Sequence, residues 1–254
     1  MEKLEYKGKS VLNPLQNEKE WRENPFVQGS PLLFPANRTA GARFSFRGRE
    51  YLLPVTEKDD NLNKHGLLYC QRFWVQKVLE NSITLRFENT GEIYPFNFVI
   101  TAEYTLENGG ARQKFTIDNT GTTDMPYTFA LHTSFLEPAY FRVPISYVHE
   151  KDEKHIPTGR YLPLSGVEAA YAAGIDPRGV PISGYYKANG HTAVIGDWRY
   201  TVSDSFDHFI LYNAGGKSGY LCIEPQAGAV NGLNTPSGHR IIPLKGREIL
   251  ETFI

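Results

Sequence analysis

Apolar and polar residues alternate with a period of two along much of the chain. The clearest runs are residues 83–88, 98–106 and 114–119, where every second side chain is apolar or aromatic. This alternation is typical of strands that bury one face. Asn108 and Gly109 lie between the second and third runs, and both accept the positive φ angles of a tight turn. We therefore expect these two runs to pair as an antiparallel hairpin.

Helical patterns are rare. The best candidate is residues 17–23, which Pro25 would end after about two turns. Fifteen Tyr, fifteen Phe, 23 Gly and 16 Pro suit short strands separated by turns. We predict a mainly β protein, a large antiparallel β-sandwich with a concave face, formed by residues 1–254 as a single domain.

Charge narrows the range of partners. Lys and Arg number 27 against 28 Asp and Glu, which gives a formal net charge of −1. Such a balance offers no long-range field for nucleic acid or an anionic membrane, so we expect neither as a partner. The expected ligand is a small molecule that is close to neutral, or one whose charge is met by local groups of the site.

The N-terminal ten residues are charged throughout and lack the apolar region of a secretory signal. No apolar run approaches the length needed to span a bilayer, so the expected location is cytoplasmic. Cys70 and Cys222 form neither a CxxC pair nor a disulfide-rich pattern. We interpret both as reduced thiols that fill space, although a bridge between them stays open.

His132 is the first candidate for chemistry. It lies in a run, 128–135, that is predicted to be one strand. Alternation puts Phe129, Leu131 and Thr133 on one face and His132 with Thr128, Ala130 and Ser134 on the other, which is polar enough to line a cleft. A hydrogen-bonded structural histidine is the competing interpretation.

Glu224 is the second candidate. Alternation places it on the same face as Tyr220 and Cys222, opposite Leu221 and Ile223. Pro225 lacks an amide hydrogen and is predicted to end the strand directly after it. A carboxylate at a strand end is well placed to face a site, although an ion-paired surface glutamate would show the same pattern. A histidine and a carboxylate in one cleft could protonate one oxygen of a cyclic hemiacetal while deprotonating another.

Four further residues are candidates for binding. His65 lies in a turn-rich loop, where Gly66 would allow close backbone approach to a ligand. Asn37 and Arg38 follow a proline-rich aromatic segment, and the guanidinium offers several fixed donors to hydroxyl groups. Asp207 precedes His208 and an apolar run, as a possible acceptor for hydroxyls.

Other chemistries have little support. The seven histidines show no close ligand spacing, so we expect no metal. Residues 214–219 end in Gly-Lys-Ser-Gly but lack the rest of a phosphate-binding loop, and a hairpin turn is the better interpretation. The charged run 150–155 is predicted to be a solvated loop without a catalytic role.

Several short motifs, taken in order, resemble the aldose 1-epimerase (galactose mutarotase) family. They are residues 31–35 with Asn37 and Arg38, residues 44–51, 64–66, 132–135 and 223–226. The resemblance implies a galactose mutarotase-like β-sandwich that interconverts the α and β anomers of an aldose without metal or organic cofactor. Family members usually carry an additional N-terminal hairpin, which is expected to be shortened in this chain.

The resemblance also implies roles for individual residues. Glu224 matches the general base that takes the proton of the C1 hydroxyl, and His132 matches the general acid that protonates the ring oxygen. His65 matches a second catalytic histidine near the ring. Arg38 matches a hydroxyl-binding arginine, with Asn37 beside it, and Asp207 matches a substrate-binding aspartate.

Two alternatives stay open beside an aldohexose mutarotase. A mutarotase for hexose 6-phosphates would need cations near C6, for which Lys64, Arg43 and Arg72 are candidates; we favour the neutral sugar. A noncatalytic sugar-binding β-sandwich would have no need for both Glu224 and His132. The sequence leaves the oligomeric state open.

Overall fold

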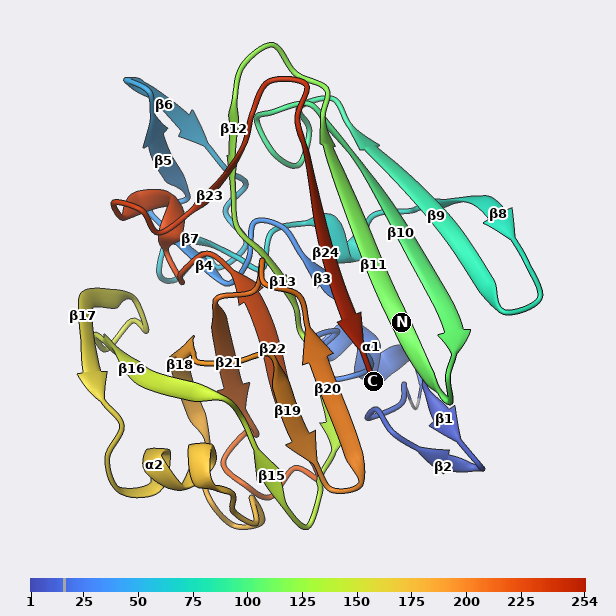
Figure 1. Cartoon of the computed structure of the whole chain (residues 1–254). Helices are drawn as coiled ribbons and strands as arrows, with labels where there is room; N and C mark the ends of the chain where they lie inside the picture. The colour runs from blue at the N-terminus through green and yellow to red at the C-terminus, as the bar shows by residue number, and fades with distance from the viewer. Residues whose placement is uncertain (16) are drawn as a thin grey trace.

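Two large antiparallel sheets make up most of the computed structural model, which describes residues 1–15 and 17–254 (Figure 1). The first sheet has eight strands, in the order β15 (Phe141–Arg142), β19 (Thr192–Ile195), β20 (Trp198–Val202), β24 (Arg247–Phe253), β11 (Gly110–Asn119), β10 (Phe98–Glu107), β9 (Ser82–Asn89) and β8 (Trp74–Val78). The prediction of a mainly β protein with large antiparallel sheets is confirmed.

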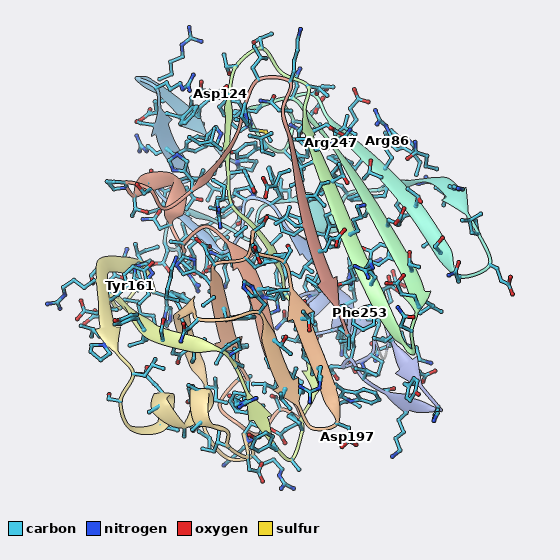
Figure 2. The ribbon with its side chains drawn as sticks, viewed as in Figure 1. Arg86, Asp124, Tyr161, Asp197, Arg247 and Phe253 are labelled. Atoms are coloured by element: carbon cyan, nitrogen blue, oxygen red, sulfur yellow. The ribbon has the colours of Figure 1, made fainter. Side chains whose placement is uncertain are left out.

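The second sheet carries the candidate site. Its order is β17 (Pro157–Pro163), β16 (Ile145–Lys151), β18 (Ser183–Ala188), β21 (His208–Tyr212), β22 (Tyr220–Ala227), β13 (Phe129–Leu131) and β3 (Leu32–Leu33), with β14 (Ser134–Leu136) also paired to β22. Strands β16 and β17 form its outer edge, where Tyr161 is exposed (Figure 2).

Smaller elements complete the chain. Four two-stranded sheets pair β1 (Glu5–Tyr6) with β2 (Lys9–Ser10), β4 (Arg38–Ala40) with β7 (Leu62–Lys64), β5 (Arg43–Phe46) with β6 (Arg49–Leu52), and β12 (Met125–Tyr127) with β23 (Arg240–Ile242). The helices are α1 (Glu18–Glu23), α2 (Gly166–Ala173) and the 3₁₀ turns Leu68–Cys70 and Gly232–Asn234. Within the described residues, none of these helices is long and apolar enough to cross a membrane.

The predicted hairpin and helix are both present. Strands β10 and β11 pair antiparallel up to the facing residues Glu107 and Gly110. The two residues between them have φ angles of 50° at Asn108 and 76° at Gly109, as a type I′ turn requires. Helix α1 begins after Asn17, whose side chain accepts a hydrogen bond from the Glu20 amide at 3.0 Å.

The main core lies between the two large sheets. Phe115 of β11 and Phe129 of β13 are fully buried, and their ring centroids are 5.3 Å apart. Leu221 and Ile223 of β22 belong to the same core cluster. Burying one such side chain stabilises the fold by roughly 1.5–3 kcal/mol, so this layer holds β13 and β22 rigidly in place.

Two predictions about loops have different outcomes. Residues 213–219 join the neighbouring antiparallel strands β21 and β22, so the hairpin interpretation is confirmed. The charged run 150–155 was expected to be a loop throughout, but Glu150 and Lys151 belong to β16. Strand pairing with β17 and an ion pair between Glu150 and Arg160 hold this part of the run in the sheet.

Both cysteines are free thiols, as expected. Cys222 is completely buried and fills space in the core. Cys70 is exposed, so the space-filling interpretation is wrong for that residue. It lies in the short 3₁₀ turn Leu68–Cys70, of which only Leu68 turns into the core.

Candidate active site

A break in the second sheet positions His132. The predicted continuous strand 128–135 is wrong, because β13 ends at Leu131 and β14 begins at Ser134. The His132 amide donates to the carbonyl of Pro31 at 3.0 Å, and the Thr133 amide donates back to Leu131 at 2.9 Å. Phe129 and Leu131 lie in the core and His132 lines a pocket, as predicted. The other residues predicted to share its face, Thr128, Ala130 and Ser134, are buried and do not line this pocket.

Glu224 lies inside strand β22 rather than at its end, which corrects the expectation that Pro225 ends the strand. The Ile223 amide donates to Thr133, so the nitrogen of Pro225, two residues later, faces the same side. The register that pairs Ala130 with Gln226 puts Pro225 opposite Leu131, whose carbonyl accepts a hydrogen bond from the Thr133 amide instead. The missing amide hydrogen therefore costs no ladder hydrogen bond, and the strand continues to Ala227.

The two side chains meet directly. His132 Nε2 lies 3.2 Å from Glu224 Oε1, and both residues are at least 95% buried. Burial raises the pKa of Glu224 well above 4.5, against a smaller opposite effect of the Arg38 charge. Burial also lowers the pKa of His132 to about 3. Both groups therefore favour their neutral forms, so the pair holds one titratable proton, which burial favours on Glu224.

A pocket of about 270 Å³ opens above this pair, close to the lower end of the range of ligand sites of roughly 300–1,000 Å³. Five of the six residues singled out in the sequence line it together: Asn37, Arg38, His65, His132 and Glu224. The structure thus brings them into one site, while their roles stay predictions.

His65 approaches the pair from the loop after β7. Its ring centroid is 5.4 Å from that of His132 and 4.4 Å from that of Phe26. Burial lowers its pKa well below 6.5, with further lowering by His132 and Lys64. Gly66 serves a packing role, because a Cβ there would lie 1.9 Å from the Phe34 carbonyl oxygen. The expected close approach is thus to the protein's own backbone.

Arg38 is held by neutral partners. Its Nη1 donates to the Tyr185 hydroxyl at 2.9 Å and to the Asn37 side-chain oxygen at 3.3 Å. Within residues 1–15 and 17–254 no carboxylate lies within 4.0 Å of its guanidinium nitrogens. The remaining N–H groups of the guanidinium can thus serve a ligand in the pocket.

Sequence reasoning missed several residues of the pocket. Tyr185 and Ser183 line it from β18, and Lys151 Nζ donates to the Ser183 hydroxyl at 3.3 Å. His155, from the run assigned no catalytic meaning, also lines the pocket. Alternation in 183–188 places Ser183 and Tyr185 on one face, but nothing in the sequence indicates that β18 adjoins β21.

The structure does not bring Asp207 into this pocket. Asp207 lines a second cleft with Lys187 and His208. The reason is strand register: Ile210 of β21 lies opposite Glu224, so Asp207 is three residues away along the strand, just before β21 begins. Asp207 therefore lies outside the pocket of His132 and Glu224, and its substrate-binding role stays a prediction.

The candidate phosphate-binding cations are also dispersed. Lys64 lines the pocket and forms an ion pair with Glu57 at 3.1 Å. Arg43 is exposed and pairs with Glu50 at 3.7 Å. Neither Arg43 nor Arg72 lines the pocket.

One group of side chains could ligate a metal ion. Nitrogen, sulfur and oxygen atoms of His132, Cys222 and Glu224 all lie within 4.8 Å of one another, and all three residues are buried. A metal would need the thiolate of Cys222, but burial raises the pKa of this thiol well above 9.0. The Cys222 thiol instead contacts the Ser134 hydroxyl at 3.4 Å. This donor set therefore fits an acid–base pair better than a resident metal.

Fold and pocket together define a galactose mutarotase-like β-sandwich with a buried carboxylate–histidine pair. The chain belongs to the aldose 1-epimerase family, whose model matches residues 2–246.

One curated relative agrees with this assignment, and two solved structures have a similar fold. Galactose mutarotase of Mus musculus is 30% identical over 143 residues, which cover 52% of this chain and 41% of the mouse protein. The chain thus matches less than half the length of this curated relative. A galactose mutarotase-like protein from Clostridium acetobutylicum has a similar fold, with a TM-score of 0.86 at 20% identity over 96% of this chain and 86% of that chain. A putative aldose 1-epimerase from Escherichia coli has a TM-score of 0.81 at 18% identity, over 96% of this chain and 88% of that chain.

Proposed function

We propose that this protein is a mutarotase that interconverts the α and β anomers of a free aldohexose in the pocket above His132 and Glu224. The observation that carries this proposal is the 3.2 Å contact between His132 Nε2 and Glu224 Oε1 at a polar pocket. Opening a hemiacetal requires one proton to leave the C1 hydroxyl and another to reach the ring oxygen. Both oxygens are bonded to C1, so a base and an acid in direct contact can serve both.

The reaction needs two proton transfers in each direction. Glu224 takes the proton of the C1 hydroxyl while His132 donates a proton to the ring oxygen, the C1–O5 bond breaks, and the open-chain aldehyde forms. Rotation about the C1–C2 bond exposes the other face of the aldehyde. The ring then closes as both protons return. A positioned acid and base each contribute about 10²–10⁴-fold, which suffices without a covalent intermediate.

The protonation state of the pair fits this cycle. Without ligand, burial favours protonated Glu224 beside neutral His132. A sugar hydroxyl that donates a hydrogen bond to Glu224 stabilises its carboxylate, and so favours movement of the shared proton to His132. The total number of protons on the pair stays at one, so binding needs no exchange with bulk solvent.

The other pocket residues position the sugar. Arg38, fixed by Tyr185, offers guanidinium donors to ring hydroxyls. Asn37 and His65 line the same wall, and the neutral imidazole of His65 can accept or donate a hydrogen bond near the ring.

Polarimetry tests the proposal. Freshly dissolved α-D-glucose and α-D-galactose should equilibrate faster in proportion to enzyme concentration. If a panel of free aldoses equilibrates at the uncatalysed rate although the sugars bind, the noncatalytic sugar-binding interpretation takes its place.

A second candidate substrate is a hexose 6-phosphate. Lys64, Arg38 and His155 line the pocket, Lys151 adjoins it, and among its lining residues Glu224 is the one carboxylate. We favour the neutral sugar because Lys64 pairs with Glu57 and the Lys151 ammonium is held by Ser183, which leaves Arg38 as the cation free of competing bonds to charged or backbone oxygens. A kcat/KM that is higher for glucose 6-phosphate than for glucose, and that falls as salt rises, would reverse this choice.

A further inference from the structure

A second cleft of about 560 Å³ lies beside the proposed active site on the same sheet. Tyr185, Ile210 and Glu224 face one another across β18, β21 and β22 in the first pocket. The next row that points to the same side is Lys187, His208 and Gln226. Residues two apart on a strand are separated by about 6.6 Å, so the two sites are neighbours along the strands.

Tyrosine rings form the outer wall of this cleft. Tyr161 of β17 lies opposite His149 of β16, and their rings stack with centroids 4.2 Å apart and an angle of 9°. Tyr147 lines the cleft two residues before His149. Tyr147 is 49% exposed and Tyr161 is 40% exposed, so apolar ring surface is presented to solvent.

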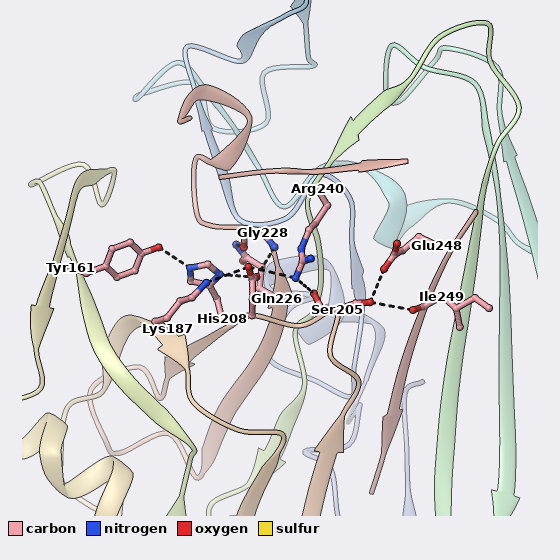
Figure 3. Close-up of polar contacts among 10 residues, drawn as sticks. Tyr161, Lys187, Ser205, His208, Gln226, Gly228, Arg240, Glu248 and Ile249 are labelled. Carbon is pink, nitrogen blue, oxygen red and sulfur yellow. Dashed lines mark hydrogen bonds and ion pairs between the residues drawn. The ribbon is translucent and has the colours of Figure 1, made fainter. Parts of the chain in front are cut away.

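Hydrogen bonds hold the floor of the cleft in one arrangement (Figure 3). His208 Nδ1 donates to Asp207 Oδ1 at 2.9 Å, and the Tyr161 hydroxyl donates to His208 Nε2 at 2.8 Å. The Gly228 amide also donates to Asp207 Oδ1, at 2.9 Å. Tyr161 is therefore fixed at both its ring face and its hydroxyl before any ligand arrives.

Charged groups in the cleft, and Arg240 beside it, compensate one another. Lys187 Nζ lies 3.4 Å and the Arg240 guanidinium lies 3.6 Å from Asp207 Oδ2. A phosphate or a carboxylate would have to compete with Asp207 for these cations. Neutral hydroxyl groups, by contrast, can share both the donors and the acceptor.

We infer that this cleft binds a second sugar ring, so that the preferred substrate is a reducing disaccharide whose reducing ring occupies the pocket of Glu224. The inference rests on the proposed mutarotase function and names its substrate class. A pyranose presents an apolar C–H face that packs on exposed tyrosine rings, and hydroxyl edges that suit Asp207 and Lys187. The short separation along the strands lets one ligand occupy both sites.

The test compares glucose with four disaccharides of glucose: maltose, cellobiose, isomaltose and gentiobiose. At least one should exceed glucose in kcat/KM by about tenfold. Tyr161→Ala should remove most of that excess. Tyr147→Ser, which changes a half-exposed side chain outside the core, should do the same. Tyr140→Ala is the matched control, because Tyr140 is 41% exposed but lines neither site. The inference is overturned if no disaccharide exceeds glucose, or if the excess survives both substitutions.

Methyl glycosides separate this inference from the proposed function, because they bind but cannot mutarotate. The methyl glycosides of the same four disaccharides and of glucose are titrated into the wild-type protein and the three variants by calorimetry. At least one disaccharide glycoside should bind about tenfold more tightly than methyl glucoside, and Tyr161→Ala should abolish the difference. Equal affinities would overturn the second sugar site even if mutarotation is observed. A clear difference would support it even if no sugar is mutarotated.

Discussion

His132 and Glu224 are joined by a 3.2 Å contact that exists because the backbone between β13 and β14 leaves the sheet at His132. Glu224 points to the same place from the middle of β22. Both side chains are buried, and burial favours the neutral form of each, protonated Glu224 beside neutral His132. Catalysis and the pH dependence of stability are therefore linked through this pair.

The first prediction concerns the proton acceptor. Glu224→Gln keeps the size and shape of the side chain but cannot take a proton, so kcat for mutarotation should fall by about 10²-fold or more with little change in sugar affinity. Polarimetry with freshly dissolved α-glucose measures kcat, and calorimetry measures affinity. Glu80→Gln, at an exposed position, is the matched control. Turnover of Glu224→Gln close to that of the wild type would remove Glu224 from the mechanism.

The second prediction concerns the free energy of unfolding between pH 4.5 and 6.5, the ordinary pKa values of glutamate and histidine. The lowered pKa of folded His132 means that the unfolded state binds the extra proton, so stability is lost as pH falls. The raised pKa of folded Glu224 has the opposite sign, so stability is gained as pH falls. In the wild type the two contributions cancel, because folded and unfolded states both hold one proton on the pair.

Glu224→Gln removes the contribution of Glu224 to the pH dependence of stability and leaves that of His132. Relative to the wild type, the variant should lose unfolding free energy as pH falls from 6.5 toward 4.5, by up to about 1.4 kcal/mol for each pH unit. Urea unfolding at several pH values measures this difference, and contributions of other histidines cancel in the comparison. Parallel pH dependence in the two proteins would show that His132 and Glu224 do not share one proton.

Local sequence signals predicted much of this structure. The hairpin of β10 and β11 follows from alternation and two turn residues, and helix α1 follows from its N-cap Asn17. His132 and Glu224 were found by short motifs, because the contexts of an acid and a base are local. Tyr185 and Lys151 were not found, since their place at the pocket depends on strand order. Asp207 lies in the neighbouring cleft, a position that depends on the register of β21 against β22 and that local sequence does not indicate.

The third prediction concerns the pH profile of the free enzyme. The active form of the pair carries one proton. Activity is therefore lost only when a second proton binds or when the single proton leaves. Since burial lowers the pKa of His132 to about 3, kcat/KM for the sugar should show no acid limb at the ordinary histidine pKa of 6.5. The alkaline limb should lie above 4.5, because the pKa of Glu224 is raised. An acid limb near pH 6.5 would mean that His132 titrates as an exposed histidine does.

The last prediction concerns the fork geometry of Arg38. Arg38→Lys retains the charge but loses the planar set of donors that Tyr185 and Asn37 hold in place, so KM for the sugar should rise by about tenfold while kcat changes less. Tyr185→Phe, which removes only the hydroxyl that fixes the guanidinium, should raise KM in the same direction by a smaller factor.

The double variant decides whether Tyr185 acts through Arg38. If it does, KM of the double variant relative to the wild type should rise by less than the product of the two single-variant factors. The reason is that in Arg38→Lys the Tyr185 hydroxyl no longer has a guanidinium to position. Initial rates over a range of sugar concentrations give KM and kcat for all four proteins. Independent effects that multiply fully would show that Tyr185 contacts the sugar directly and does not position Arg38.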